Sequence, residues 1–449
     1  MTKRTTAAAV AMALAAAMAT EAVRADAPPI SVLFVGNSYT FGRVDPVLSY
    51  NAANVRDLTQ PQGPLNGGRD PALTFTTGAP FTNLTGTNSY PVGTINPATS
   101  QPFTSYSPHS QTQAWGGVPG IFKQMTVQAG LNYDVALSTR NAATLRGHFL
   151  NTANSNWNLR GNIRSDSWDK VVLQEQSDEP LTAQTVNGSV LASNFASFQA
   201  YADVIENYVH SGAALSYRER DLFTGGNNTL RTIEANSNAN SAAQLYLQQT
   251  WARPNMINAP GATIIDPATG NATYDTSKPA TSFFASLEAM AADLRQAYLA
   301  AAANAALDNT GGFAAIAPVG DAFLRAVTSG VATRDMYAAD AATDGLVDLW
   351  FNDGTHAAVH GSYLSALTLF GTLTGLDPAM LGAQEIAARD LGISSAEALA
   401  LQRVASDQLG FAAPVPEPGA WALFVAGLAV LVWRQRRTHS ESARRMLPA

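Results

Sequence analysis

Short apolar runs that alternate with longer helix-like stretches constrain the fold of this chain most strongly. Each run has the length and the β-branched or large apolar residues of a buried strand. The predicted strands are Ile30–Val35, Tyr133–Ser138, Lys170–Leu173, Ala243–Gln248 and Phe313–Ala317. The predicted helices are Val118–Ala129, Val190–His210, Ser282–Ala306 and a final helix that begins near Gly361. Strands that alternate with helices predict an α/β fold with a mostly parallel sheet, covered by helices on both faces.

The composition fits one large folded body. The chain has 449 residues, of which 46% are hydrophobic and 14% are charged, so it can build a sizeable core. The net charge is −7, and the sequence has no basic stripe with interleaved aromatic residues, so we expect no nucleic-acid partner. The absence of cysteine excludes disulfides, thiolate zinc sites and thiol catalysis.

Residues 1–25 have the features of a secretory signal peptide. Lys3 and Arg4 give a positive start, and an apolar run follows from about Ala7 to Met18. Small residues then allow cleavage by signal peptidase after Ala25. We therefore expect an exported protein whose mature body spans residues 26–413.

Residues 414–449 combine three features in a fixed order. A Pro-Glu-Pro sequence begins at Pro416, an uncharged apolar run covers Ala420–Trp433, and a basic cluster begins at Arg434. Basic residues after an apolar run keep that end of a chain on the cytoplasmic side. This triple resembles the PEP-CTERM sorting signal of bacterial envelope proteins. The resemblance implies a transient inner-membrane anchor, cleavage by an exosortase-type enzyme, and release to the cell surface or extracellular matrix. The alternative is a permanent membrane anchor.

Two polar segments interrupt the pattern of strands and helices. The segment from about Tyr50 to Ala114 is rich in Thr, Asn, Pro, Gly and Ser, and a loop of this length is uncommon inside a compact domain. It follows the first strand, so it is expected to be either a flap over the carboxyl edge of the sheet or a solvated insertion. A second polar segment, Gly225–Asn240, is predicted to be a surface loop.

Ser38 and the segment from Asp353 to His356 are the candidate catalytic residues. Ser38 follows the first strand, so its hydroxyl is expected at the carboxyl edge of the sheet, where open α/β folds bind ligands. Residues three apart in a tight turn can meet, so Asp353 can accept the Nδ1 proton of His356 and leave Nε2 for the serine. His360 is the rival histidine. Its spacing from His356 would suit a helical metal pair, but no glutamate follows His356 as in the H-E-x-x-H motif.

Three blocks in the sequence resemble those of the SGNH (GDSL-like) hydrolases. They are the first block, Val35–Phe41, the third or middle block, Val171–Ser177, and the last block, Asp353–His356 followed by Gly361–Leu364. The middle block is similar to that of a branch related to carbohydrate esterases. The resemblance implies a three-layer α/β/α sandwich with a small parallel sheet, in the SGNH/flavodoxin-like arrangement. It also implies that Ser38 is the nucleophile, His356 the base and Asp353 the residue that orients the base, with no cofactor and no metal.

The oxyanion donors that the resemblance implies match this chain less well. They are the backbone N–H of Ser38, a backbone N–H of the second block and a side-chain amide of the third. The second block is best matched by Asn141–Leu145, where Ala142 replaces the usual glycine. The third block has Gln176, or as an alternative Gln174, where asparagine is usual.

Together these features predict an exported serine esterase that hydrolyses an O-acyl ester, with a carbohydrate as the expected carrier. The alternative is a surface or matrix protein that retains the fold without efficient catalysis. Tyr39, Phe41 and Trp251 are expected either to line a sugar-binding cleft or to pack in the core.

Overall fold

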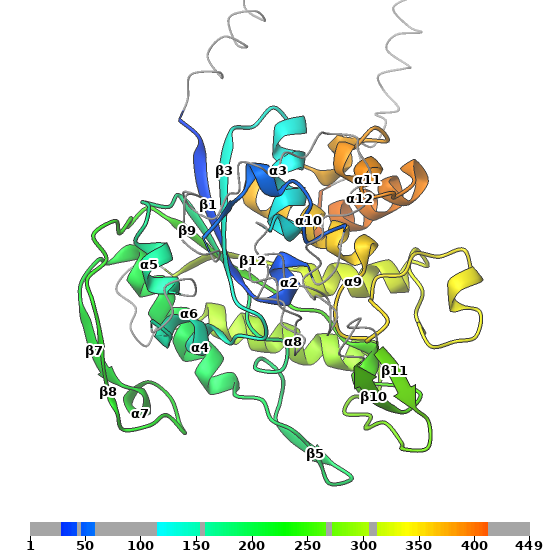
Figure 1. Ribbon diagram of the computed structural model, residues 1–449, viewed down its shortest axis with the longest axis horizontal. Coiled ribbons are helices and arrows are strands. Elements are labelled where there is room, and N and C mark those ends of the chain that lie inside the picture. Colours follow the sequence, from blue (N-terminus) through cyan, green and yellow to red (C-terminus); the bar gives the residue numbers. More distant parts are fainter. Residues whose placement is uncertain are drawn as a thin grey trace, which may run out of the picture. The chain divides into compact units, whose positions relative to one another are not determined.

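A six-stranded parallel sheet forms the centre of this computed structural model (Figure 1). The structure describes residues 28–42, 46–58, 115–152, 158–265, 272–304 and 312–411. The predicted signal peptide, the predicted sorting segment and residues 59–114 of the predicted insertion lie outside these ranges.

All neighbouring strands of the sheet are parallel, in the order β12-β9-β4-β1-β3-β2. The strands are β1 (Ile30–Gly36), β2 (Arg56–Asp57), β3 (Tyr133–Thr139), β4 (Lys170–Leu173), β9 (Gln244–Gln248) and β12 (Phe313–Ala317). Without the two-residue edge strand β2, the order in space corresponds to 2-1-3-4-5 in chain order, the flavodoxin-like arrangement. The predicted α/β fold with a parallel sheet is therefore confirmed.

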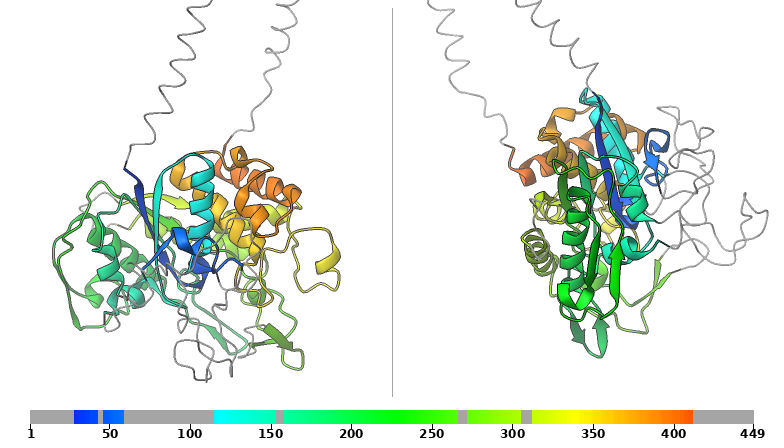
Figure 2. Two further views of the ribbon diagram at one scale, coloured as in Figure 1. Left: turned by 45° about the horizontal axis from the view of Figure 1, so that its top comes forward. Right: turned by 90° about the vertical axis from the view of Figure 1, so that its left-hand side faces the viewer.

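Helices cover both faces of the sheet. The main ones are α3 (Gly117–Gln128), α6 (Phe195–His210), α8 (Leu287–Ala302), α9 (Val319–Thr328), α10 (Val359–Thr374) and α12 (Ser395–Leu409). The helix α3 contacts α10, whereas α6 contacts α8. Because parallel crossovers are right-handed and the chain moves in opposite directions from β1 to β3 and from β4 to β9, these two pairs lie on opposite faces. Figure 2 shows the same elements from two further directions.

Shorter elements surround this framework. The short helices are α2 (Ser38–Phe41), α4 (Leu145–Leu150), α5 (Leu159–Ile163), α7 (Glu219–Leu222) and α11 (Ile386–Asp390), and the 3₁₀ turns are Ala52–Asn54, Pro254–Met256, Ala341–Thr343 and Pro378–Leu381. Three antiparallel hairpins pair β5 (Gln184–Val186) with β6 (Ser189–Leu191), β7 (Leu215–Arg218) with β8 (Leu230–Ile233), and β10 (Ala262–Ile265) with β11 (Ala272–Asp275).

The sequence predicts the central strands well because they are almost continuously apolar. Six of the seven residues of β1 are buried, and all four residues of β4 are buried. A strand that is buried on both faces carries apolar residues at successive positions instead of alternating ones. The core therefore lies on both sides of β1 and β4, and it holds the carboxyl ends of these strands rigidly.

Several predicted boundaries were wrong. The helix predicted from Val190 begins at Phe195, because Asn194 caps it by accepting the Ser197 N–H and because residues 189–191 form β6. The helix predicted from Ser282 begins at Leu287, where Ser286 is the cap.

Other polar segments contain structure that the sequence pattern did not reveal. Gly225–Asn240 is not only a loop, because β8 pairs there with β7. Residues 56–57, inside the predicted insertion, form β2 on the edge of the sheet. The helix near Gly361 is not the final one, since α11 and α12 follow it. Each missed strand has four residues or fewer, and each is joined to only one partner, so its stability comes from pairing and not from an apolar pattern of its own.

Candidate active site

The first component of the site is the turn that joins β1 to α2. The strand ends at Gly36 and the helix begins at Ser38, with Asn37 between them. The Asn37 side chain accepts the Tyr39 N–H at 3.1 Å and so caps the helix. A Cβ atom at Gly36 would lie 2.2 Å from Thr40 Oγ1 and 2.5 Å from Gln174 Oε1. Only glycine allows this close approach, which places the Ser38 hydroxyl beyond the end of the strand.

The second component is the turn from Asp353 to His356. One oxygen of Asp353, Oδ1, accepts the backbone N–H groups of Thr355 and His356, both at 2.9 Å. The other oxygen, Oδ2, lies 2.6 Å from His356 Nδ1. Gly354 has φ of +63°, and a Cβ there would lie 2.1 Å from the Tyr337 hydroxyl oxygen, so this turn also requires glycine.

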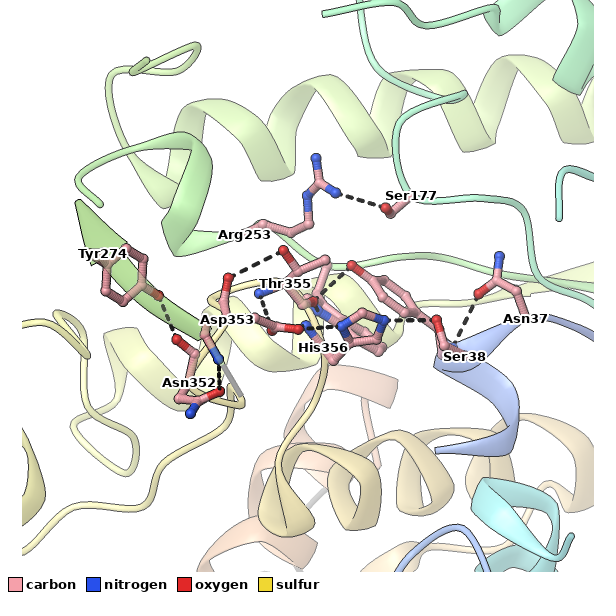
Figure 3. Close-up of polar contacts among 12 residues, drawn as sticks. Asn37, Ser38, Ser177, Arg253, Tyr274, Asn352, Asp353, Thr355 and His356 are labelled. Carbon is pink, nitrogen blue, oxygen red and sulfur yellow. Dashed lines mark hydrogen bonds and ion pairs between the residues drawn. The ribbon is translucent and has the colours of Figure 1, made fainter. Parts of the chain in front are cut away.

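The two turns meet although they are far apart in the sequence. Ser38 Oγ lies 2.8 Å from His356 Nε2 (Figure 3). With the Nδ1 proton donated to Asp353, Nε2 is the acceptor for the Ser38 hydroxyl. Burial by itself raises the pKa of the Asp353 carboxyl, but hydrogen bonds from His356 and Thr355 outweigh burial and hold this pKa below its usual value. Asp353 is therefore ionised at neutral pH and favours the tautomer with a proton on Nδ1.

Aromatic side chains support the turn that carries His356. The carbonyl oxygen of Thr355 accepts the Tyr39 hydroxyl at 2.8 Å and the Trp251 Nε1–H at 3.0 Å. The rings of Tyr39 and Trp251 stack at 4.0 Å between centroids, and Phe323 stacks on the other side of Trp251 at 4.6 Å. Tyr39, Phe41 and Trp251 are all buried, so they pack in the core and do not line a sugar-binding cleft.

Gln174, the alternative amide for the oxyanion, does not fit that role. It is fully buried, and its Oε1 accepts the Asn37 N–H and the Thr40 hydroxyl, each at 3.0 Å. Its Nε2 donates to the Glu175 carbonyl oxygen. Both ends of the amide are thus engaged inside the protein, where they fix the turn below Ser38.

The other predicted oxyanion donors retain free hydrogen-bonding groups. Ala142 has φ of +53°, the conformation in which glycine is favoured, and its side chain is exposed. Among the described residues, neither its N–H nor the Ser38 N–H donates to another protein atom. Gln176 is partly buried, and its Oε1 accepts the Asp178 N–H at 2.6 Å. This bond turns the Nε2 end of the amide away from Asp178.

Two buried titratable residues at this edge of the sheet were not predicted. The buried side chain of Glu175 contacts the second block, and its Oε1 accepts the N–H groups of Leu145 and Gln176. Arg253 follows the end of β9, is buried, and donates to Ser177 Oγ at 2.8 Å and to the Asp178 carboxylate. Glu175 lies inside the middle block. The sequence signal that could have identified it is a carboxyl side chain directly after an apolar strand. No comparable pattern marks Arg253.

His360 is not paired with His356 on one helix. The helix α10 begins at Val359, so His356 precedes it. His360 Nε2 lies 3.6 Å from Glu397 Oε2, away from the turn that carries His356. Within the described ranges, no group of three His, Cys, Asp or Glu side chains is arranged to hold a metal ion.

The comparisons with known proteins bear mainly on the C-terminal segment. Residues 414–437 match the family model described as the PEP-CTERM protein-sorting motif, which confirms the sorting signal predicted from the sequence. The motif indicates export to the cell envelope, transient membrane anchoring and processing by an exosortase. No helix in the part of the chain that the structure describes has both the length and the hydropathy to cross a bilayer.

Two solved structures are similar to the chain at a distance. One is a DUF4886 family protein from Bacteroides uniformis, at 12% identity and a TM-score of 0.37, covering 86% of this chain and 96% of that one. The other is a candidate SGNH hydrolase from Slackia heliotrinireducens, at 15% identity and a TM-score of 0.34, covering 77% of this chain and 100% of that one. No curated protein matches the chain.

Proposed function

We propose that this protein is an exported serine esterase of the SGNH type that hydrolyses an O-acyl ester. The observation that carries the proposal is the continuous chain of contacts from Ser38 Oγ through the His356 ring to Asp353, at 2.8 Å and 2.6 Å. A nucleophile, a base and a residue that orients the base are the groups that acyl transfer requires. Their position at the carboxyl ends of parallel strands is where α/β folds bind ligands.

The proposed reaction proceeds through an acyl-enzyme. His356 Nε2 takes the proton of Ser38 as Oγ attacks the ester carbonyl carbon, and the carbonyl oxygen becomes an oxyanion. The N–H groups of Ser38 and Ala142 and the Nε2 amide of Gln176 are the proposed donors to that oxygen. The imidazolium then protonates the leaving alcohol. Water, deprotonated by His356, hydrolyses the acyl-serine and releases the acid.

The proposed substrate is an O-acyl group on a carbohydrate. Two features support it: the resemblance of Val171–Ser177 to the middle block of carbohydrate-esterase relatives, and the sorting motif at residues 414–437, which directs the protein to the cell envelope. A simple aryl acetate, which carries a small acyl group and a good leaving group, is the appropriate first substrate.

Substitution of the nucleophile tests the proposal. Ser38→Ala is expected to lower kcat on an aryl acetate by about 10⁴-fold or more, because members of a triad act as a unit. Ser241→Ala, at an exposed serine, is the matched control and should leave kcat unchanged. Full activity of the Ser38 variant would disprove the assignment.

The second candidate function is that of a non-catalytic surface or matrix protein. Two observations favour it, namely Ala142 in a backbone conformation that suits glycine and Gln176 in place of asparagine. Labelling with a fluorophosphonate probe separates the two functions. Rapid labelling that Ser38→Ala abolishes supports the esterase, whereas no labelling of the folded wild-type protein supports the non-catalytic role.

A further inference from the structure

Glu175 occupies the space between the two loops that carry the proposed oxyanion donors. It follows β4, is 1% exposed, and uses one oxygen, Oε1, to accept two backbone N–H groups. These belong to Leu145, at 2.9 Å, and to Gln176, at 2.6 Å. One carboxyl oxygen therefore joins the end of Asn141–Leu145 to the end of Val171–Ser177.

Hydrogen bonds hold the loop that carries Ala142 at its start, in its middle and at its end. At its start, the Arg140 N–H donates to the Gly36 carbonyl oxygen at 3.0 Å. In its middle, Asn37 Nδ2 donates to the Ala143 carbonyl oxygen at 3.1 Å. At its end, the Leu145 N–H donates to Glu175. The first two contacts come from the turn before Ser38, whereas Glu175 attaches this loop to the loop of Gln176.

Glu175 can accept the two hydrogen bonds without carrying a negative charge. Burial raises the pKa of this carboxyl to about 8, although the N–H groups of Gln176 and Leu145 favour the ionised form. Glu179 and Tyr298 are the other titratable groups that influence it or are influenced by it. Near neutral pH the carboxyl is therefore mostly protonated, and the hydrogen bonds to the loops do not depend on a negative charge. A glutamine would offer the same acceptor oxygen.

We propose that Glu175 is a positioning residue that sets the distance between the Ala142 N–H and the Gln176 amide, and thereby the geometry of the oxyanion site. This inference rests on the proposed esterase function. Glu175 acts through the two loops and does not contact the substrate. Its loss should therefore weaken stabilisation of the transition state and leave ground-state binding nearly unchanged.

The test compares three substitutions by kcat and KM on an aryl acetate near pH 7. Glu175→Ala removes the acceptor and is expected to lower kcat by about 10²-fold with KM within about 3-fold, as for loss of an oxyanion donor. Glu175→Asp keeps the carboxyl but shortens its reach, and is expected to lower kcat by about 10-fold. Glu175→Gln restores the acceptor and should recover at least about 10-fold of the alanine loss.

Glu179→Gln is the matched control, because Glu179 lies on the same loop, is partly buried and, among the described residues, donates or accepts no side-chain hydrogen bond. Thermal unfolding identifies any variant that does not fold. If Glu175→Ala does not fold, the kcat values of Glu175→Asp and Glu175→Gln test the inference. The inference is overturned if kcat of the alanine and aspartate variants stays within about 3-fold of wild type, or if glutamine is as impaired as alanine. Activity that survives Ser38→Ala would overturn the esterase function itself.

Discussion

The two sides of the proposed active site are constructed differently. On the side of the nucleophile and base, the buried side chains of Gln174 and Asp353 and two buried aromatic rings hold Ser38 and His356 in glycine-containing turns that pack against the core. On the side of the oxyanion, the loops of Ala142 and Gln176 are held by the side chains of Asn37 and Glu175. All departures from the family blocks fall on the second side. The exposed Ala142 and the partly buried Gln176 can change without disturbing the core, whereas a turn packed against the core cannot.

The largest expected effect is on kcat, from a substitution on the side of the nucleophile and base. Asp353→Asn retains the shape of the side chain but no longer favours the Nδ1–H tautomer of His356, so kcat is expected to fall by about 10⁴-fold. The measurement is steady-state hydrolysis of an aryl acetate, with Asp407→Asn at an exposed site on α12 as the control. A loss of less than about 10-fold would mean that Asp353 does not orient the base.

A smaller effect is expected when the turn before Ser38 is crowded. Gly36→Ala places a methyl group 2.2 Å from Thr40 Oγ1 and 2.5 Å from Gln174 Oε1. Overpacking of this kind costs about 1–3 kcal/mol of unfolding free energy, and the displaced turn should also lower kcat. Denaturation in urea measures the first effect. Gly147→Ala in α4, whose added methyl would meet only Thr144 Oγ1 at 3.1 Å, should be tolerated.

The support of the Thr355 carbonyl can be weakened in steps. Tyr39→Phe and Trp251→Phe each remove one donor to that oxygen while an aromatic ring remains. Tyr39→Phe should cost about 1 kcal/mol of stability. Trp251→Phe should cost more, because the smaller ring also leaves a cavity in the core. The double variant leaves the carbonyl without either donor, and it should cost more than the sum of the two. The unfolding free energies and kcat values of wild type, the two single variants and the double variant form a double-mutant cycle. Strict additivity would show that the two donors act independently.

The smallest expected effect concerns pH and the second side. Because burial raises the pKa of Glu175 to about 8, the folded protein retains this proton at pH values where the unfolded chain has released it. The unfolded state then binds fewer protons, so the contribution of Glu175 to stability falls as pH rises from the ordinary glutamate range to about 8. Glu175→Gln should show a smaller decline than wild type in urea midpoints over this interval. Parallel declines would contradict the buried, protonated carboxyl.

The sequence predicts those parts of the fold whose own residues show an apolar or periodic pattern. The strand β4 was predicted at its observed bounds, because every residue in it is apolar or lies at a buried end. The helix α6 was predicted five residues too early, because Val190 and Leu191 look helical but pair with Gln184 and Thr185 across a hairpin. Pairing of this kind depends on a partner elsewhere in the chain and leaves no periodic pattern.

The same reasoning separates the predicted from the unpredicted parts of the site. Ser38, Asp353 and His356 could be proposed because strand ends and tight turns are local, and the structure places them within hydrogen-bonding distance of one another. Arg253 could not be proposed, because its partners Ser177 and Asp178 lie about 75 residues earlier in the chain. The alternative amide, Gln174, could not be separated from Gln176 by sequence, since only the folded turn reveals that Thr40 and Asn37 engage it.

The separation of Ser38 and His356 has a consequence for biosynthesis. The two residues are 318 positions apart, and one contact between them completes the proposed catalytic chain. At a synthesis rate of about 5–20 residues per second, roughly 16 to 64 s pass between the incorporation of the serine and that of the histidine. Throughout that interval the nascent polypeptide has a serine hydroxyl without its base. A truncated product that ends before residue 356 would therefore lack the proposed base altogether.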